Sequence, residues 1–185
     1  MQPQPCPGLR AAIGRVSRCT GEGEMDAALE HESIPTPNLS FAADIRVDVG
    51  EPIAVGETGA GLRRVIPILG GTVDGPRLSG RVVPGGADFQ VLRPDGVMEL
   101  EAKYVLEATN GALIYVVNSG LRHGPADAVE KLMRGEPVDP NLIYFRAAPS
   151  FETAAPEFKW MTRSLFVCTG TRLPAQVLLR LYEIT

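Results

Sequence analysis

The stretch spanning residues 66–88 most constrains what this chain can fold into. It holds six glycines and three prolines among apolar and β-branched residues. Turn-forming residues at this density exclude a helix, because glycine and proline are the poorest helix formers. The apolar residues between them favour burial, so the stretch is not a linker. We therefore expect a run of short strands bent at glycines, which brings the acid Asp88 to one face of a sheet.

Composition limits the classes of protein to consider. The chain has 185 residues, a net charge of −4 and a sequence pI near 5.3. Nucleic-acid binding requires clustered positive charge, so we expect no nucleic-acid partner. No apolar run approaches the roughly 20 residues that span a bilayer, so we expect no membrane partner and a cytoplasmic location. The 20 glycines and 16 prolines suit an all-β domain with many turns.

The cysteines and histidines argue against a metal site. Cys6, Cys19 and Cys168 share no metal-like spacing, and His31 and His123 are the only histidines. A zinc site would need more ligands than this set supplies. Cys168 lies in an apolar run and is expected to be a buried thiol. No glycine spacing matches a phosphate- or nucleotide-binding motif, so we expect neither metal nor cofactor.

The N-terminal residues differ from the rest in charge. Up to Gly21 the only charges are arginines, whereas acidic residues predominate from Met25 onward. We hypothesise that translation begins at Met25 and that residues 1–24 are a mis-called extension; an arginine-rich transit peptide is the alternative. We expect residues 1–37 to be disordered and residues 38–185 to form a single β-barrel domain.

Alternating apolar and polar residues predict most of the strands. This period-2 pattern marks half-buried strands over residues 39–49 and 98–108. One helix is expected between Pro125 and Gly135, with a turn at Pro94-Asp95-Gly96. About nine or ten strands should close into a barrel or fold into a sandwich, because open edges invite aggregation. The further strands are expected at residues 53–55, 62–69, 112–118, 142–148, 164–169 and 176–184, with one more beginning at Asp88.

A hairpin is predicted at Asn110-Gly111, a pair of residues that strongly favours a two-residue turn. Such a turn would place Tyr104 and Tyr115 on the same, inward face of the sheet. It would place Asn118 on the other face or at the rim. Val105, Ile114 and Val116 would then form an apolar outer strip, which predicts a homodimer.

Three groups of residues form an ordered pattern. They are Gly70-Gly71-Thr-Val-Asp-Gly75-Pro76 with Gly80 and Pro84-Gly85-Gly86-Ala87-Asp88; Asn110-Gly111-Ala112 with Ile114-Tyr115, Asn118 and Gly120; and Tyr144-Phe145-Arg146 with Pro149, Phe151-Glu152 and Trp160. Over residues 38–184 this pattern resembles the domain of unknown function 3237 family. The resemblance implies a closed antiparallel β-barrel of about 8–10 strands, similar to allene oxide cyclase, with one short surface helix. The family has no general assigned activity.

The chain departs from the family pattern at three positions. Asn110 stands where an aspartate is common, Phe89 where a tryptophan is usual, and Phe158 where a tyrosine is usual. The first change leaves the turn intact. The two phenylalanines are expected to reshape or dry the pocket, so a substrate preference is not carried over from the family.

Asp88 and Arg146 are the main candidates for catalysis. Inside a barrel, desolvation would raise the pKa of Asp88 and suit it to general acid–base work. The alternative is a structural carboxylate bound to glycine N–H groups or to an arginine. Arg146 lies between apolar neighbours, where a guanidinium needs a carboxylate partner. It would hold a substrate carboxylate or enolate, or else form an internal salt bridge with Asp88 or Glu152.

The remaining candidates would shape a pocket for a flat ligand. Tyr115, counted with the catalytic candidates, and Tyr104 would polarise a carbonyl, and Trp160 would stack on it. The last group of expected ligand-binding residues is Asn118, Glu152, Gly85 and Gly86. The alternative for Glu152 is a solvated charge at the rim of the barrel. The alternative for Tyr104, Tyr115 and Trp160 is a place in the hydrophobic core, where aromatic residues more often lie.

Three functions remain open. The first is a cofactor-independent isomerase, cyclase or lyase acting on a small carbonyl compound, with Asp88 moving the proton. The second is a barrel that binds a small ligand without catalysis, and the third is an oligomeric assembly module. A cavity of several hundred Å³, reached by Asp88 free of Arg146, would favour catalysis; a filled lumen with the two residues paired would favour assembly.

Overall fold

The computed structural model describes residues 34–185, and its strands all lie within the unit Thr36–Thr185. The proposed start at Met25 and the expected disorder of residues 1–37, as far as residue 33, therefore fall outside the described residues. Residues 34–37 are exposed and precede the first strand.

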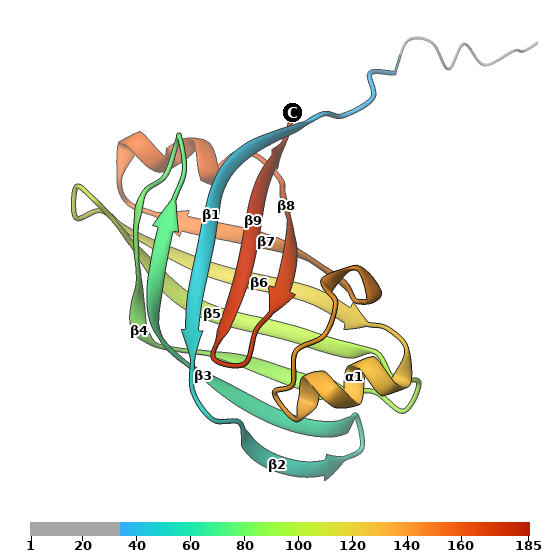
Figure 1. Cartoon of the computed structure of the whole chain (residues 1–185). Helices are drawn as coiled ribbons and strands as arrows, with labels where there is room; N and C mark the ends of the chain where they lie inside the picture. The colour runs from blue at the N-terminus through green and yellow to red at the C-terminus, as the bar shows by residue number, and fades with distance from the viewer. Residues whose placement is uncertain (1–33) are drawn as a thin grey trace, which may run out of the picture. The chain divides into compact units, whose positions relative to one another are not determined.

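Nine antiparallel strands form the sheet, which closes on itself into a barrel (Figure 1). The order is β1-β9-β8-β7-β6-β5-β4-β3-β2, and a further pairing between β1 and β3 completes a ring of eight strands. β2 pairs only with β3 and extends outside that ring. This confirms the expected closed antiparallel β-barrel. The strands are β1 (Leu39–Val49), β2 (Ile53–Thr58), β3 (Gly61–Asp74), β4 (Gly80–Leu92), β5 (Met98–Ala108), β6 (Leu113–His123), β7 (Tyr144–Thr153), β8 (Phe166–Arg172) and β9 (Gln176–Ile184).

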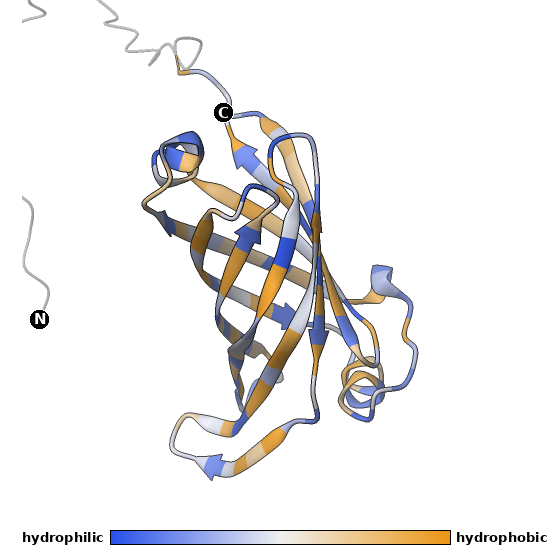
Figure 2. Ribbon diagram, turned by 90° about the vertical axis from the view of Figure 1, so that its left-hand side faces the viewer, coloured by the Kyte–Doolittle hydropathy of each residue, from blue (hydrophilic) through white to orange (hydrophobic). Residues whose placement is uncertain are grey.

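Alternating side chains divide each strand between the lumen and the outer surface. Along β1, Ala43, Ile45 and Val47 are buried, whereas Arg46 between them is exposed. Figure 2 shows the same alternation as bands of hydrophobic and hydrophilic residues along the strands. The buried residues form one core cluster inside the barrel. Burial of this apolar face is the main force that holds the strands in register.

Glycines shape the stretch of residues 66–88 differently from our expectation of several short strands. The stretch belongs to two long strands, β3 and β4, whose pairing shifts register between Pro67 and Gly71. At Gly71 φ is 141°, and an added Cβ would lie 1.9 Å from the carbonyl oxygen of Arg46 on β1. Only a glycine allows this approach. The bend therefore lets one continuous strand close the barrel onto β1, so no break is needed.

The β5–β6 hairpin has a longer loop than the predicted two-residue turn. The N–H of Gly111 donates to the carbonyl oxygen of Ala108 at 2.8 Å, and the N–H of Ala108 donates to Ala112 at 2.9 Å. With φ of 85° at Gly111, this is a three-residue loop whose glycine adopts the left-handed conformation. The predicted register is therefore wrong by one residue.

This one-residue shift reverses the faces of β6. Tyr104 pairs with Val116 rather than Val117, and Tyr115 pairs with Val105 and points outward. Ile114 and Val116 are fully buried. The apolar outer strip on which the homodimer expectation depended is therefore wrong, and the homodimer itself stays a prediction.

Short helices lie at opposite ends of the barrel (Figure 1). The expected helix is α1 (Ala126–Met133), which follows β6 and precedes the 3-10 helix η2 (Pro140–Leu142). A second 3-10 helix, η3 (Pro156–Thr162), lies against β7, and its Glu157 accepts a hydrogen bond from Asn110 at the hairpin tip. Among residues 34–185, no helix is long and apolar enough to cross a membrane.

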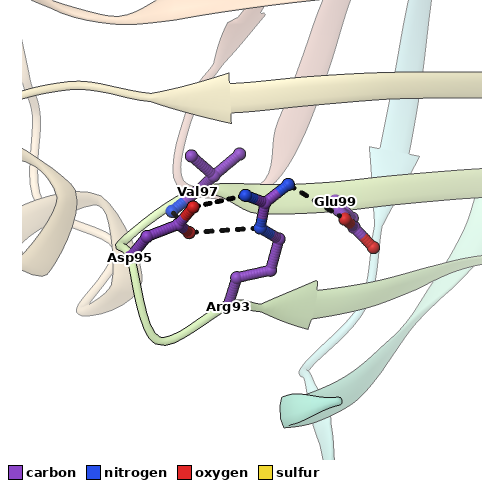
Figure 3. A network of polar contacts seen from close by, with 4 residues as sticks. All are labelled: Arg93, Asp95, Val97 and Glu99. Carbon is purple, nitrogen blue, oxygen red and sulfur yellow. Dashed lines mark hydrogen bonds and ion pairs between the residues drawn. The ribbon is translucent and has the colours of Figure 1, made fainter.

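The turn between β4 and β5 confirms the expected turn at Pro94-Asp95-Gly96. The N–H of Arg93 donates to the carbonyl oxygen of Val97, and Gly96 has φ of 84°. The Asp95 carboxylate accepts from the Val97 N–H at 3.2 Å and pairs with Arg93, which also reaches Glu99 (Figure 3). The Arg93 guanidinium lowers the pKa of Asp95. This exposed network lies at the turn that joins β4, which carries Asp88, to β5.

Barrel closure predicts that Gly71→Ala destabilises the protein strongly. The added methyl group would meet the Arg46 carbonyl in a backbone conformation that alanine rarely adopts. We expect a loss of about 2–4 kcal/mol in the free energy of unfolding, measured by urea denaturation. Gly59→Ala is the matched control, because an added Cβ there meets nothing within 4 Å. Equal stability of the two variants would contradict the closure argument.

Candidate functional site

The site is a narrow lumen that opens into a wider vestibule near α1. The lumen has a free volume of about 40 Å³, which admits a few water molecules and is well below the usual size of a ligand pocket. Small side chains, Ala102 and Ala147, line it beside Asp88. The vestibule has about 320 Å³, and it shares Gln90 and Arg172 with the lumen.

Asp88 lies inside the barrel, as the sequence predicts. On β4 it pairs with Ile66 of β3 and Ala102 of β5, and it shares the inward face with Gln90. Its Oδ2 accepts a hydrogen bond of 2.6 Å from Nε2 of Gln90. Its Oδ1 is buried and has no hydrogen-bond partner among the described residues. One oxygen is thus left free at the lumen.

Burial dominates the protonation of Asp88. Desolvation raises the pKa of the carboxyl group. The hydrogen bond from Gln90, the positive charge of Arg122, the nearby backbone N–H of Glu101 and the positive charge of Arg64 oppose that rise. The net effect is upward, which favours a neutral acid inside the barrel. Such a group can donate a proton at a pH where an exposed aspartate is ionised.

A relay of hydrogen bonds determines where the proton lies. Nε of Arg64 donates to Oε1 of Gln90 at 2.8 Å, so the Gln90 amide must present its N–H to Asp88. Gln90 is 4% exposed and is held in this orientation. Because Oδ2 of Asp88 already accepts from Gln90, a proton on Asp88 is best placed on Oδ1. The proton is therefore expected on Oδ1, the carboxyl oxygen that has no hydrogen-bond partner among the described residues.

Two further arginines surround this relay. Arg122 on β6 is 6% exposed, and its guanidinium lies 5.7 Å from the ring of Phe145. Burial, with the like charge of Arg64, lowers the pKa of Arg122 to about 10. Arg172 at the end of β8 donates from Nη1 to the carbonyl oxygen of Gln176 at 3.0 Å. The positive charges accordingly concentrate at the α1 end of the barrel.

Tyr104 and Asn118 line the lumen on the side of β5 and β6. Burial raises the pKa of the Tyr104 phenol, which keeps it a neutral hydrogen-bond donor. Asn118 lies opposite Ala102 and is buried, contrary to the expected rim position, because of the loop register. Its Nδ2 is 3.9 Å from Sγ of Cys168, a free thiol whose pKa burial raises to about 11. Cys168 is the buried thiol we expected.

Arg146 and Tyr115 lie outside the lumen, so their expected inward placement is wrong. Glu152 is also exposed, in agreement with its alternative as a solvated charge. On β7, Phe145, Ala147 and Phe151 are the buried set, and Arg146 and Glu152 alternate with them and are exposed. Arg146 donates to the Phe145 carbonyl oxygen at 2.8 Å and forms no salt bridge with Asp88 or Glu152. The two flanking apolar residues misled the prediction, whereas the period of two along β7 indicates the outer face.

Three residues that were expected to bind a ligand, Trp160, Gly85 and Gly86, contact other parts of the protein instead. Trp160 lies on η3, where the Arg77 guanidinium stacks 3.6 Å from its ring centroid. An added Cβ at Gly86 would lie 2.6 Å from Cβ of Tyr104. Gly85, with φ of 110°, allows the β4 bulge that makes this approach possible. The glycine pair thus brings β4 against Tyr104.

Sequence reasoning missed four of the polar groups near Asp88. These groups are Gln90, Arg64, Arg122 and Arg172, and the sequence analysis gave none of them a role. The period of two gives a signal for Arg122, since it shares the inward face of β6 with Asn118. No local pattern relates Arg64 and Arg172, because β3 and β8 are distant in the sequence. Within residues 34–185 no group of three His, Cys, Asp or Glu side chains is placed to hold a metal ion.

The fold and the lumen define the class of protein. It is a closed antiparallel barrel that holds an acid in its lumen and carries positive charge at the α1 end, where the lumen meets the vestibule. The chain belongs to the family described as Protein of unknown function (DUF3237), whose model matches residues 37–184. A UPF0311 protein from Rhodopseudomonas palustris (strain ATCC BAA-98 / CGA009) is 46% identical over 150 residues, which cover 81% of this chain and 98% of the relative.

Solved structures of similar proteins share the barrel. A conserved protein of unknown function from Rhodopseudomonas palustris superposes with a TM-score of 0.78 at 44% identity, covering 82% of this chain and 99% of that one. A beta-barrel like protein from Acinetobacter baumannii gives 0.73 at 36% identity, covering 82% and 98%.

An enzyme is found at a greater distance. A structure of an enzyme from Penicillium herquei has a TM-score of 0.62 at 22% identity, covering 83% of this chain and 98% of that one. At this identity the likeness concerns the fold alone. A hydroalkoxylation enzyme from the same organism is 30% identical over 88 residues, which are 47% of this chain and 58% of the relative.

The buried carboxyl predicts a pH-dependent cost in stability. Because the pKa of Asp88 is raised in the folded state, the folded protein retains a proton that the unfolded chain releases above pH 3.8. Stability should therefore fall with rising pH, by about 1.4 kcal/mol per unit, between 3.8 and the folded pKa.

The variant Asp88→Asn tests this cost. It keeps the shape of the carboxyl group without ionising, so we expect it to be more stable than the wild type at pH 8 and to lose that advantage near pH 4. Urea unfolding at several pH values measures the difference. Asp74→Asn, at an exposed position, is the matched control; a pH-independent difference for Asp88→Asn would refute the raised pKa.

Proposed function

We propose that this protein is a cofactor-independent acid–base enzyme that isomerises or cyclises a small compound in the barrel lumen. The observation that carries the proposal is the free, buried Oδ1 of Asp88. A native protein rarely leaves a buried polar atom without a partner. An acid with a raised pKa in a concave site is a candidate for proton transfer.

In the proposed reaction Asp88 donates one proton to the substrate and takes one proton back from it. Protonated Asp88 donates its Oδ1 proton to a carbonyl oxygen or an alkene carbon of the substrate. A hydroxyl oxygen or a neighbouring C–H bond of the substrate then supplies the electrons for the new bond and releases its proton to Oδ1. Product and substrate have the same composition, so no oxidant or reductant is needed. Where the substrate is a carbonyl compound, Tyr104 would donate a hydrogen bond to the same oxygen and help to polarise the carbonyl group.

The name of the Penicillium herquei relative narrows the reaction class. A hydroalkoxylation adds an O–H group across a carbon–carbon double bond, which is a proton donation followed by attack of an oxygen. A ring closure of this type fits the acid Asp88 and requires no cofactor. We therefore prefer a cyclase or isomerase over a lyase.

A barrel that binds a ligand without catalysis is the second candidate. The lumen, at about 40 Å³, falls short of the cavity of several hundred Å³ that would favour catalysis. The body of any ligand would have to remain in the vestibule or widen the lumen. In that case the free Oδ1 of Asp88 would only hydrogen-bond the ligand.

Identification of a trapped substrate tests the proposal. Asp88→Asn cannot donate the proton, so this variant should retain substrate when purified from its native cells. Mass spectrometry of the extracted small molecules identifies it. Incubated with wild-type protein in D2O, the compound should become an isomer carrying one deuterium where a proton is added to carbon. We expect Asp88→Asn to slow this conversion about 10²–10⁴-fold.

Asp74→Asn is the control and should convert the compound at the wild-type rate. Recovery of the compound unchanged from wild-type protein, without deuterium, would refute the enzyme and support the binding barrel.

A further inference from the structure

Two arginines at the mouth of the barrel, where the lumen meets the vestibule, and a third buried behind it lack carboxylate partners. No carboxylate lies within salt-bridge distance of Arg64, Arg122 or Arg172 among residues 34–185, although Asp88 and Glu51 act on them at longer range. Elsewhere in the described chain, arginines do form salt bridges, and these are Arg77, Arg81, Arg93, Arg134 and Arg180. Partners are therefore missing where burial makes them most valuable.

Positive charge at the mouth contrasts with the charge of the whole chain. The net charge of the protein is −4. The mouth carries the guanidinium groups of Arg64 and Arg172, with Arg122 behind them, against Glu51 and a carboxyl group, Asp88, whose raised pKa favours the neutral form. Arg134 also faces the vestibule, but it is paired with Glu130 and Glu136. The net potential at the mouth favours an anion.

The geometry also separates a polar mouth from an apolar interior. Arg64 and Arg172 line the vestibule, and the Arg64 side chain is partly committed through its Nε to Gln90. The terminal nitrogens of Arg64 have no hydrogen-bond partner in the described part of the chain. Beyond Gln90 the lumen walls are mostly aliphatic, and they include Val47, Ile68 and Leu179. A matching ligand is anionic at one end and apolar at the other.

We propose that the mouth binds the carboxylate of a small organic acid between Arg64 and Arg172, with the apolar part of the molecule directed into the lumen toward Asp88. The planar guanidinium matches a carboxylate through paired hydrogen bonds. Arg122, buried behind the mouth, adds attraction without touching the ligand. This inference rests on the proposed function only in taking Asp88 as the residue that reacts with the ligand. It gives Arg64 and Arg172 the role that was expected of Arg146, which is to hold the carboxylate of a substrate.

Binding of hexanoate, compared with neutral hexanamide, tests the site in the full chain. We follow the titrations by NMR of ¹⁵N-labelled protein, including the Nε–H signals of the arginines. Hexanoate should bind at least about 10-fold more tightly than hexanamide, and Arg64→Gln and Arg172→Gln should each remove most of that difference. Arg46→Gln, on the exposed face of β1, is the control with the same change of charge.

The outcomes separate this inference from the proposed function. Asp88→Asn should keep the preference for hexanoate even if it abolishes turnover. Equal affinity for acid and amide would overturn the carboxylate site, and so would binding of inorganic phosphate at this site without binding of hexanoate. Loss of folding in one arginine variant leaves the other variant decisive, and higher ionic strength should weaken hexanoate binding to the wild type. None of these results depends on whether Asp88 transfers a proton.

Discussion

Closure of the sheet between β1 and β3 is the constraint on which the rest of the structure depends. Gly71 makes it possible, since any side chain there would occupy the space of the Arg46 carbonyl group. Without that pairing the sheet would have two free edges, and its inner face would remain in contact with water. Closure buries this face, and the burial raises the pKa of Asp88. A backbone contact on one side of the barrel thus governs the acid chemistry available inside it.

The polar groups of the lumen hydrogen-bond the Asp88 carboxyl group without pairing it directly with a positive charge. Direct pairing with Arg64 or Arg122 would hold Asp88 ionised and lower its pKa. Gln90 stands between Arg64 and Asp88 instead, and passes on one hydrogen bond without a formal charge. The carboxyl group keeps an oriented oxygen and an unpartnered one. This arrangement costs stability, and it fits the proposed proton transfer, because a purely structural acid would be better satisfied by the arginine itself.

Local patterns predicted most of the fold but only part of the site. The last expected strand coincides with β9, and Asp88 lies on the inward face as expected. Strict alternation predicted the bounds of β1 and β5. It failed for Tyr115 because two-residue and three-residue loops both use Asn-Gly, and the choice between them changes the face of every residue in β6. It failed for Arg146 because apolar neighbours were weighted above the period of the strand. Contacts such as Arg64 with Gln90 depend on strand order, which no short motif contains.

The size of the lumen decides how the charge at the mouth can act. A space of about 40 Å³ accepts the narrow end of a ligand, while the 320 Å³ of the vestibule can hold its larger part. An anion held by Arg64 and Arg172 would also stabilise those two positive charges, and its field would raise the pKa of Asp88 further, since a like charge disfavours ionisation of the acid. An anionic ligand would therefore strengthen the protonation on which the proposed chemistry depends. A neutral ligand would not raise the pKa of Asp88 in this way. The proposed carboxylate site and the proposed acid chemistry are therefore linked by the charge of the ligand.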